Sequence, residues 1–133
     1  MGAVVVGYVA KPEGEAAVEQ GIAEAKLRGA GLVVVNSQRG GREYDDSVSL
    51  RTEQDLSALD AKLMDSGVDY EVRHLVRGQE PAEDLISIAE SCDADLIVIG
   101  LRRRTPVGKL ILGSNAQRIL LDAPCPVLAV KVG

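Results

Sequence analysis

Residues 95–132 read DLIVIGLRRRTPVGKLILGSNAQRILLDAPCPVLAVKV, the most informative pattern in the chain. An apolar run at 96–99 ends at Gly100, a basic loop follows, and Gly113 with Ser114 opens a segment of helical spacing before a second apolar run. This pattern predicts a buried strand, a loop, a helix and another buried strand, as in a parallel α/β sheet. Ligands of open α/β sheets bind beyond the carboxyl ends of the strands, and helix starts attract phosphate. The sequence therefore predicts a small-anion site in this region.

Charge is distributed unevenly along the chain. The 133 residues carry a formal net charge of −5, but residues 96–121 contain no acidic side chain and five basic ones. A basic segment in an acidic protein favours a small anion over a nucleic acid duplex as the ligand. Alternatively, the three arginines at 102–104 form only a solvated loop, since exposed arginines are common. The residues alone leave both interpretations open.

The apolar residues make up 46% of the chain and are almost all aliphatic, with no Phe, no Trp and three Tyr. The core must therefore be aliphatic, and aromatic platforms for stacking single-stranded nucleic acid are missing. No apolar stretch reaches the roughly 20 residues of a membrane span, and the N-terminal residues lack a secretory or acylation pattern. We therefore expect a cytoplasmic protein that binds neither nucleic acid nor membrane.

Residues suited to metal or nucleophile chemistry are few. Cys92 and Cys125 lack CxxC spacing, so we expect packed, reduced thiols. His74 is the single histidine and lies among apolar neighbours on one face of a predicted strand, which indicates a hydrogen-bonded structural histidine. We predict no catalytic residue and no metal site.

Strand-like and helix-like segments alternate, which predicts one α/β domain over residues 1–133 with a mostly parallel sheet covered on both faces. The strands are expected at 4–9, 32–35, 68–77, 96–100 and 127–132, and the helices at 13–28, around Leu56, Leu59 and Leu63, from Pro81 to Cys92, and at 114–121. Residues 68–77 alternate between apolar and charged, which is typical of an edge strand. Residues 36–49 form a long polar loop that is expected to be functional or mobile.

Two common phosphate-binding motifs are absent from the sequence. Gly108 and Lys109 resemble the end of a Walker A motif, but Leu110 occupies the Ser/Thr position and Arg103 the first glycine position. The first predicted strand leads into GYVAK, which contains no GxGxxG for a dinucleotide.

The chain resembles the universal stress protein family, whose loop between the fourth strand and fourth helix reads Gly-x2-Gly-x9-Gly-[Ser/Thr]. Gly100, Arg103, Gly113 and Ser114 occupy those positions, and the flanking segments ADLIVIG, LGSNAQRIL and APCPVLAV also fit. The resemblance implies a doubly wound five-stranded parallel sheet, order 3-2-1-4-5, with four helices (adenine nucleotide alpha hydrolase-like), and usually a homodimer. It also implies that one branch binds ATP, with phosphates on the glycine loop and an acid ending the first strand that holds the nucleoside.

The chain departs from that ATP-binding pattern at two positions. Arg103 replaces the second glycine, and its Cβ hinders the approach of a phosphate to the backbone, whereas its guanidinium can bind a phosphate bidentately. Val9 stands where the acid is expected, and an apolar side chain accepts no hydrogen bond from a ribose or a base. The sequence therefore predicts weakened selectivity for a nucleoside, with ATP or AMP as the candidate ligands.

Ser114 has two interpretations. With Gln117 it matches the S-x-x-Q capping box, so it serves either as an N-cap alone or as an N-cap that also contacts phosphate. Gly113 similarly serves the tight turn alone or the ligand as well. The candidate phosphate-binding residues are Gly100, Arg102, Arg103, Gly113, Ser114 and Asn115.

The last predicted strand, Val127 to Val132, carries one charge, at Lys131, and is expected at a sheet edge. An apolar edge invites pairing, so we expect a homodimer through this strand, with other proteins as further possible partners. Two functions remain: a dimeric stress-response module that senses an adenine nucleotide or another phosphate anion, or a dimeric protein-interaction module of the same fold that binds no nucleotide. Slow ATP hydrolysis is a distant third function, because hydrolysis requires a placed base or metal ligand and the loop offers only cations and amides.

Overall fold

The computed structural model describes residues 2–39, 46–77, 80–102 and 112–132. Five parallel strands form one sheet in the order β3-β2-β1-β4-β5. The strands are β1 (Ala3–Gly7), β2 (Gly31–Arg39), β3 (Tyr70–Arg77), β4 (Leu96–Arg102) and β5 (Val127–Val132). The helices in the described part of the chain are α1 (Pro12–Arg28), α2 (Asp46–Ser66), α3 (Pro81–Ser91) and α4 (Ser114–Asp122). The predicted α/β class and strand order are confirmed.

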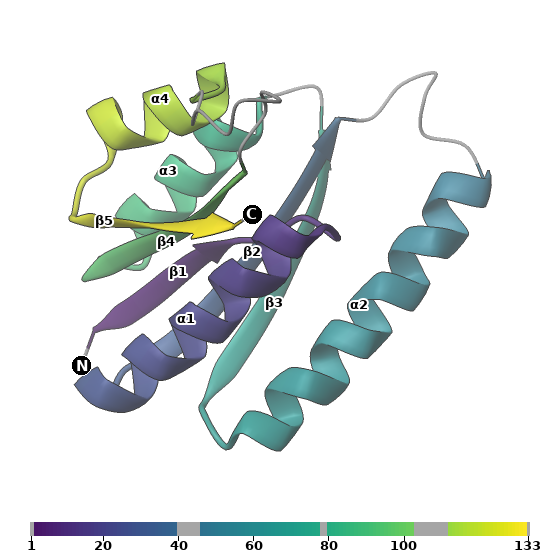
Figure 1. The fold of residues 1–133 in the computed structure, drawn as a ribbon, viewed down its shortest axis with the longest axis horizontal. Helices are drawn as coiled ribbons and strands as arrows, with labels where there is room; N and C mark the ends of the chain where they lie inside the picture. The colour runs from purple at the N-terminus through teal and green to yellow at the C-terminus, as the bar shows by residue number, and fades with distance from the viewer. Residues whose placement is uncertain (1, 40–45, 78–79, 103–111, 133) are drawn as a thin grey trace.

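The sheet separates two helical layers, with α1 and α2 on one face and α3 and α4 on the other (Figure 1). Strand β1 lies at the centre, and its Val4, Val5 and Val6 are fully buried. Val4 and Val6 pack into the cluster on the α1 face, while Val5 packs into the cluster on the α3 face. Because both faces are covered, β1 is continuously apolar rather than alternating.

The predicted loop at 36–49 is partly wrong. Strand β2 continues to Arg39, because Asn36 and Ser37 keep the parallel register opposite His74 and Leu75 of β3. Helix α2 begins at Asp46, and residues 40–45 lie outside the described part of the chain. Pairing with the neighbouring strand, rather than apolar residues, extends β2 here.

Two other strand ends differ from the prediction. Strand β1 stops at Gly7, two residues early, and β4 continues past Gly100 to Arg102, which pairs with Val132 of β5. The apolar pattern marks where a strand is buried, whereas backbone pairing sets where it ends. Both differences lie at the carboxyl ends of the strands.

Strand β3 forms the sheet edge opposite β5, as its alternating pattern predicts. Tyr70 and Val72 pack against the core, while Glu71 is exposed. The Nδ1 atom of His74 is buried and has no hydrogen-bond partner among the described residues. The hydrogen bond expected for this histidine is therefore not found at Nδ1.

Two glycines allow the first turn of α1 to lie against the carboxyl ends of β1 and β4. A Cβ on Gly14 would lie 1.7 Å from the backbone oxygen of Val9, and a Cβ on Gly100 would lie 1.9 Å from that of Glu13. Both distances are shorter than any real carbon–oxygen contact, so these positions admit no larger residue without movement. The contact fixes the start of α1 beside the ends of the central strands.

Candidate functional site

A cavity of about 400 Å³ opens at the carboxyl ends of β1 and β4, between α3 and α4. Gly7, Val35 and Ile99 line it from three neighbouring strands, and Leu85 and Ile119 line it from the two helices. This volume lies within the range of about 300–1,000 Å³ that is usual for small-molecule sites. The cavity occupies the point where the strand order reverses, which is where open α/β sheets bind ligands.

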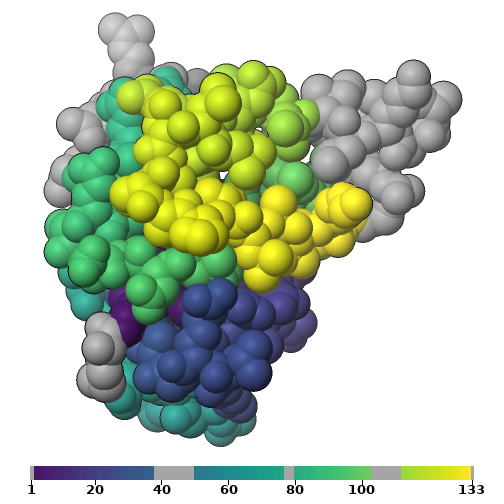
Figure 2. Space-filling view, turned by 90° about the vertical axis from the view of Figure 1, so that its left-hand side faces the viewer, coloured from purple at the N-terminus to yellow at the C-terminus, as the bar shows by residue number. Residues whose placement is uncertain are grey.

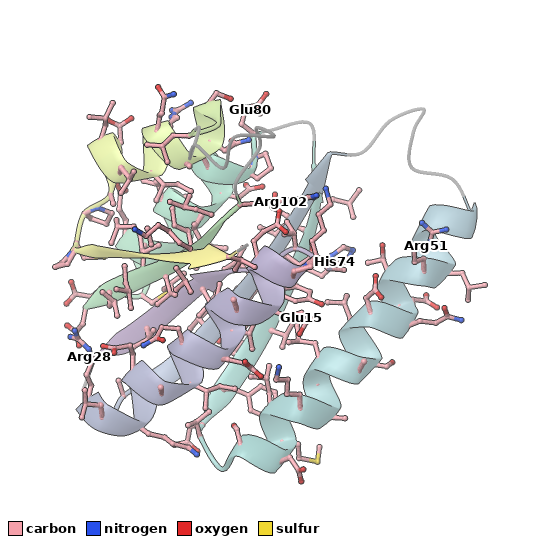
Figure 3. The ribbon with its side chains drawn as sticks, in the orientation of Figure 1. Glu15, Arg28, Arg51, His74, Glu80 and Arg102 are labelled. Atoms are coloured by element: carbon pink, nitrogen blue, oxygen red, sulfur yellow. The ribbon has the colours of Figure 1, made fainter. Side chains whose placement is uncertain are left out.

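Most of the polar side chains that line the cavity come from the starts of helices and the end of β4, while Ser37 lines it from β2 and Tyr8 from the segment after β1. Lys11 precedes α1 and Glu13 lies in its first turn, Arg102 ends β4, and Ser114 and Asn115 begin α4. Figure 3 labels Arg102 at the end of the sheet where the carboxyl ends of the strands meet. The charged side chains among these lining residues are therefore two cations and one carboxylate, and the helix starts add the positive ends of their dipoles.

The structure brings most of the predicted site residues together. Those that line the cavity are Gly100, Arg102, Gly113, Ser114 and Asn115. Arg103, the remaining candidate, lies outside the described residues. The packing alone also requires a glycine at position 100, because the carbonyl of Glu13 lies where a Cβ would be.

The capping-box prediction for Ser114 is wrong. Helix α4 begins at Ser114, so its N-cap is Gly113, with φ −71° and ψ 167° and no side-chain cap hydrogen bond. Gln117 donates from Nε2 to the carbonyl oxygen of Leu112 at 3.0 Å instead of completing a capping box. Ser114 is exposed and lines the cavity, so capping does not account for this serine.

Asn115 joins the starts of α3 and α4. Its Oδ1 accepts a hydrogen bond from the backbone N–H of Ala82 at 3.2 Å, near an N-cap that makes no side-chain cap hydrogen bond. Because Oδ1 is used in this way, the other polar atom of the side chain is Nδ2, which can only donate. Arg118 Nη1 and Glu83 Oε1 lie 2.7 Å apart and link the same two helices.

Two polar features of the cavity were missed by reasoning from the sequence. Ser37, near the end of β2, donates its hydroxyl hydrogen to Oδ2 of Asp84 at 2.5 Å, and Asp84 is only 2% exposed. These residues are 47 positions apart, so no local spacing could indicate the pair. The Oε1 atom of Glu13 is buried without a hydrogen-bond partner among the described residues. An acidic residue in the first turn of a helix is ordinarily explained by its interaction with the helix dipole, so the sequence gives no sign that Glu13 lies beside the cavity.

Tyr8, which follows β1 and lines the cavity, is linked through Glu15 of α1 to α2. Tyr8 is 3% exposed, and its hydroxyl donates to Oε1 of Glu15 at 3.0 Å. Lys62 of α2 lies 3.6 Å from the other carboxylate oxygen of Glu15, which Figure 3 labels between the sheet and α2. Burial and the Glu15 carboxylate raise the pKa of Tyr8, so its phenol remains a protonated donor. This network holds the segment that follows β1 in place beneath the cavity.

The residues that the structure describes also bear on metal binding, thiol chemistry and membrane-spanning helices. No group of three or more His, Cys, Asp or Glu residues there could hold a metal ion. Cys92 and Cys125 are free, and burial raises the pKa of the Cys125 thiol, which disfavours the reactive thiolate. None of the described helices is both long and apolar enough to cross a membrane.

Comparisons with known proteins show which family the chain belongs to. Residues 1–131 match the model of the universal stress protein family. A universal stress protein from Mycolicibacterium smegmatis is 52% identical over 128 residues, which cover 96% of each chain. A universal stress protein structure from Archaeoglobus fulgidus matches with a TM-score of 0.85 and 36% identity, covering 98% of this chain and 99% of that one. A second structure from that organism, in complex with dAMP, matches with a TM-score of 0.78 and 31% identity over 98% of each chain. The chain therefore belongs to the universal stress protein family.

Proposed function

We propose that this chain is a stress-response module that senses an adenine nucleotide, AMP or ATP, or another phosphate-bearing anion. The observation that carries the proposal is the cavity at the carboxyl ends of β1 and β4, where the starts of α3 and α4 converge with Lys11 and Arg102. Helix starts and cations are the groups that bind phosphate in proteins. The archaeal relative in complex with dAMP supports an adenine nucleotide as the ligand. We expect the protein to act in the cytoplasm.

The two parts of the cavity suit different parts of such a ligand. The apolar residues Val35, Leu85 and Ile99 offer contacts to a base, while Ser114 and Arg102 offer donors to a phosphate. Val9, which is 45% exposed at the cavity, offers no acceptor to a ribose. We therefore expect the phosphate to contribute most of the binding free energy and the nucleoside a smaller part.

Calorimetry with AMP, ATP and inorganic phosphate tests the proposal. We expect a dissociation constant below about 1 mM for AMP, which corresponds to roughly 4 kcal/mol of binding free energy. Ser114→Ala removes one donor at the phosphate and should weaken AMP binding about fivefold, as for a single hydrogen bond. Ser87→Ala is the matched control, because Ser87 is exposed on α3 and is not among the residues that line the cavity.

The opposite result would have a clear meaning. If all three ligands bind more weakly than about 1 mM, the nucleotide proposal is wrong and the alternative, a protein-interaction module that binds no nucleotide, is favoured. If inorganic phosphate binds as tightly as AMP, the site is a general anion site.

We further propose that the chain forms a homodimer through β5. This strand is an edge of the sheet, and Figure 2 shows its yellow residues open on one face of the molecule, between α4 and the C-terminal half of α1. Five of its six residues are apolar, and Lys131 is the exception. An apolar edge with unpaired backbone groups is stabilised when it pairs with the same strand of another copy.

Sedimentation of two matched variants tests the dimer. Val130→Lys adds a second charge to β5 and should convert a micromolar dimer into a monomer, because the charge would be buried at the interface. Val76→Lys makes the same change on β3, the other edge, where Val76 is 39% exposed, and should remain dimeric. Circular dichroism would verify that both variants fold. A wild-type chain that sediments only as a monomer at tens of micromolar contradicts the proposal.

A further inference from the structure

Ser37 lies on the opposite side of the cavity from the start of α4. It lines the cavity from β2, whereas Ser114 and Asn115 line it from the helix that follows β4. Strand β1 lies between β2 and β4 in the sheet. At the usual spacing of neighbouring strands, β2 and β4 are therefore about 10 Å apart. A ligand whose phosphate lies at α4 therefore has room to place its far end at Ser37.

The hydrogen bond to Asp84 fixes what Ser37 can offer to such a ligand. A hydroxyl group has one hydrogen to donate and two lone pairs that accept. The Ser37 hydroxyl donates its hydrogen to Oδ2 of Asp84 at 2.5 Å, and the Asp84 side chain is buried. With its hydrogen engaged, the Ser37 oxygen presents only lone pairs to the cavity.

At the start of α4, a hydrogen bond leaves Asn115 with donors rather than acceptors for the ligand. Its Oδ1 accepts from the backbone N–H of Ala82 at 3.2 Å, which leaves the donors of Nδ2 as its remaining hydrogen-bonding groups. The cavity thus has side-chain donors where α4 begins and a side-chain acceptor where β2 ends. Protein partners set both polarities, so neither side chain can reverse its role without breaking a hydrogen bond.

We propose that Ser37, held by Asp84, is a specificity-determining residue that accepts a hydrogen bond from an amino group on the base of the ligand. This inference rests on the proposed function, in which a nucleotide occupies the cavity. A base that carries an amino group at that position donates to the Ser37 oxygen. A base that carries a carbonyl there places two acceptors opposite each other, and one of them loses its hydrogen bond with water without a replacement. The pair therefore selects amino-bearing bases against their carbonyl analogues.

Titrations with adenosine and inosine monophosphates test this role, because the two ligands share the ribose and the phosphate and differ at the 6-position, amino against carbonyl, and at N1, which carries a hydrogen only in inosine. We expect the wild-type chain to bind adenosine monophosphate about tenfold more tightly than inosine monophosphate. Ser37→Ala should weaken only the adenosine ligand and bring the ratio of the two dissociation constants close to one. Ser114→Ala is the control variant, since it should weaken both ligands equally and leave the ratio unchanged.

A second variant keeps the test independent of how well Ser37→Ala folds. Asp84→Leu is close in size to aspartate and leaves Ser37 without this acceptor, which frees the hydroxyl hydrogen to turn toward the cavity, so the ratio should again fall. Equal binding of the two nucleotides by the wild type, or an unchanged ratio in Ser37→Ala, overturns the role of Ser37 and leaves the nucleotide site intact. Failure of both nucleotides and of inorganic phosphate to bind overturns the proposed function as well.

Discussion

Gly100→Ala is expected to destabilise the fold by about 3 kcal/mol, at the upper end of the usual cost of overpacking. The added Cβ would lie 1.9 Å from the backbone oxygen of Glu13 and 2.6 Å from its carbonyl carbon. Backbone atoms cannot move aside as the tip of a flexible side chain can, so the first turn of α1 would have to shift away from β4. Urea unfolding followed by circular dichroism would measure the loss of free energy of unfolding.

Gly31→Ala is the matched control for this experiment. Gly31 lies at the start of β2, and the nearest atom to its added Cβ would be the backbone oxygen of Asp69 at 3.8 Å, an ordinary contact. We expect its free energy of unfolding to change by less than about 0.5 kcal/mol, as for surface substitutions away from special features. Equal stabilities of the two variants would show that α1 is not held against β4 through Gly100.

This prediction also separates two reasons for a glycine at the start of the basic loop. The sequence predicts Gly100 as one of the candidate phosphate-binding residues, whereas the structure shows that the carbonyl of Glu13 lies where a Cβ on Gly100 would be. A glycine that is required for packing can also lie beside a ligand, and Gly100 lines the cavity. Unfolding and ligand binding must therefore be measured in the same Gly100→Ala variant.

Much of the fold could be predicted from the sequence because its signals are local. The alternation of strands and helices indicates a parallel sheet covered on both faces, and the alternation in β3 indicates an edge, whereas the strand order was implied by the family resemblance. The prediction failed where pairing with a neighbour overrides the local pattern. Polar Asn36 is 4% exposed inside β2 because the register with β3 continues past the apolar residues.

The candidate site could be predicted only in part, for a similar physical reason. Arg102 and Ser114 flank one loop, at the end of β4 and the start of α4, so they belong to a single stretch of sequence with a recognisable motif. The Ser37–Asp84 pair is created by the packing of α3 on β2, and the carboxylate of Glu13 is brought beside the cavity by the close contact of α1 with β4. Such contacts depend on how the layers pack, which local spacing does not encode.

Val9→Asp is expected to tighten AMP binding about tenfold or more. Val9 lines the cavity and is 45% exposed, so a carboxylate there keeps part of its hydration and costs little stability. It would accept a hydrogen bond from a ribose hydroxyl, and hydrogen bonds to a charged group contribute about 1.5–3 kcal/mol. The gain exceeds the repulsion between carboxylate and phosphate as long as the phosphate stays at α4, because charges in contact with water are screened within about 10 Å.

The ligands themselves distinguish this effect from a general change in the site. Inorganic phosphate has no ribose, so Val9→Asp should weaken its binding slightly through repulsion, and 2′,3′-dideoxy-AMP should show no gain. Val9→Ala, which removes apolar surface without adding an acceptor, should leave the affinity for AMP within about twofold of the wild type. If Val9→Asp binds AMP no more tightly than Val9→Ala does, the ribose does not reach the end of β1. The nucleoside would then be bound elsewhere in the cavity, and the missing acid would not explain any weakness of nucleotide binding in this chain.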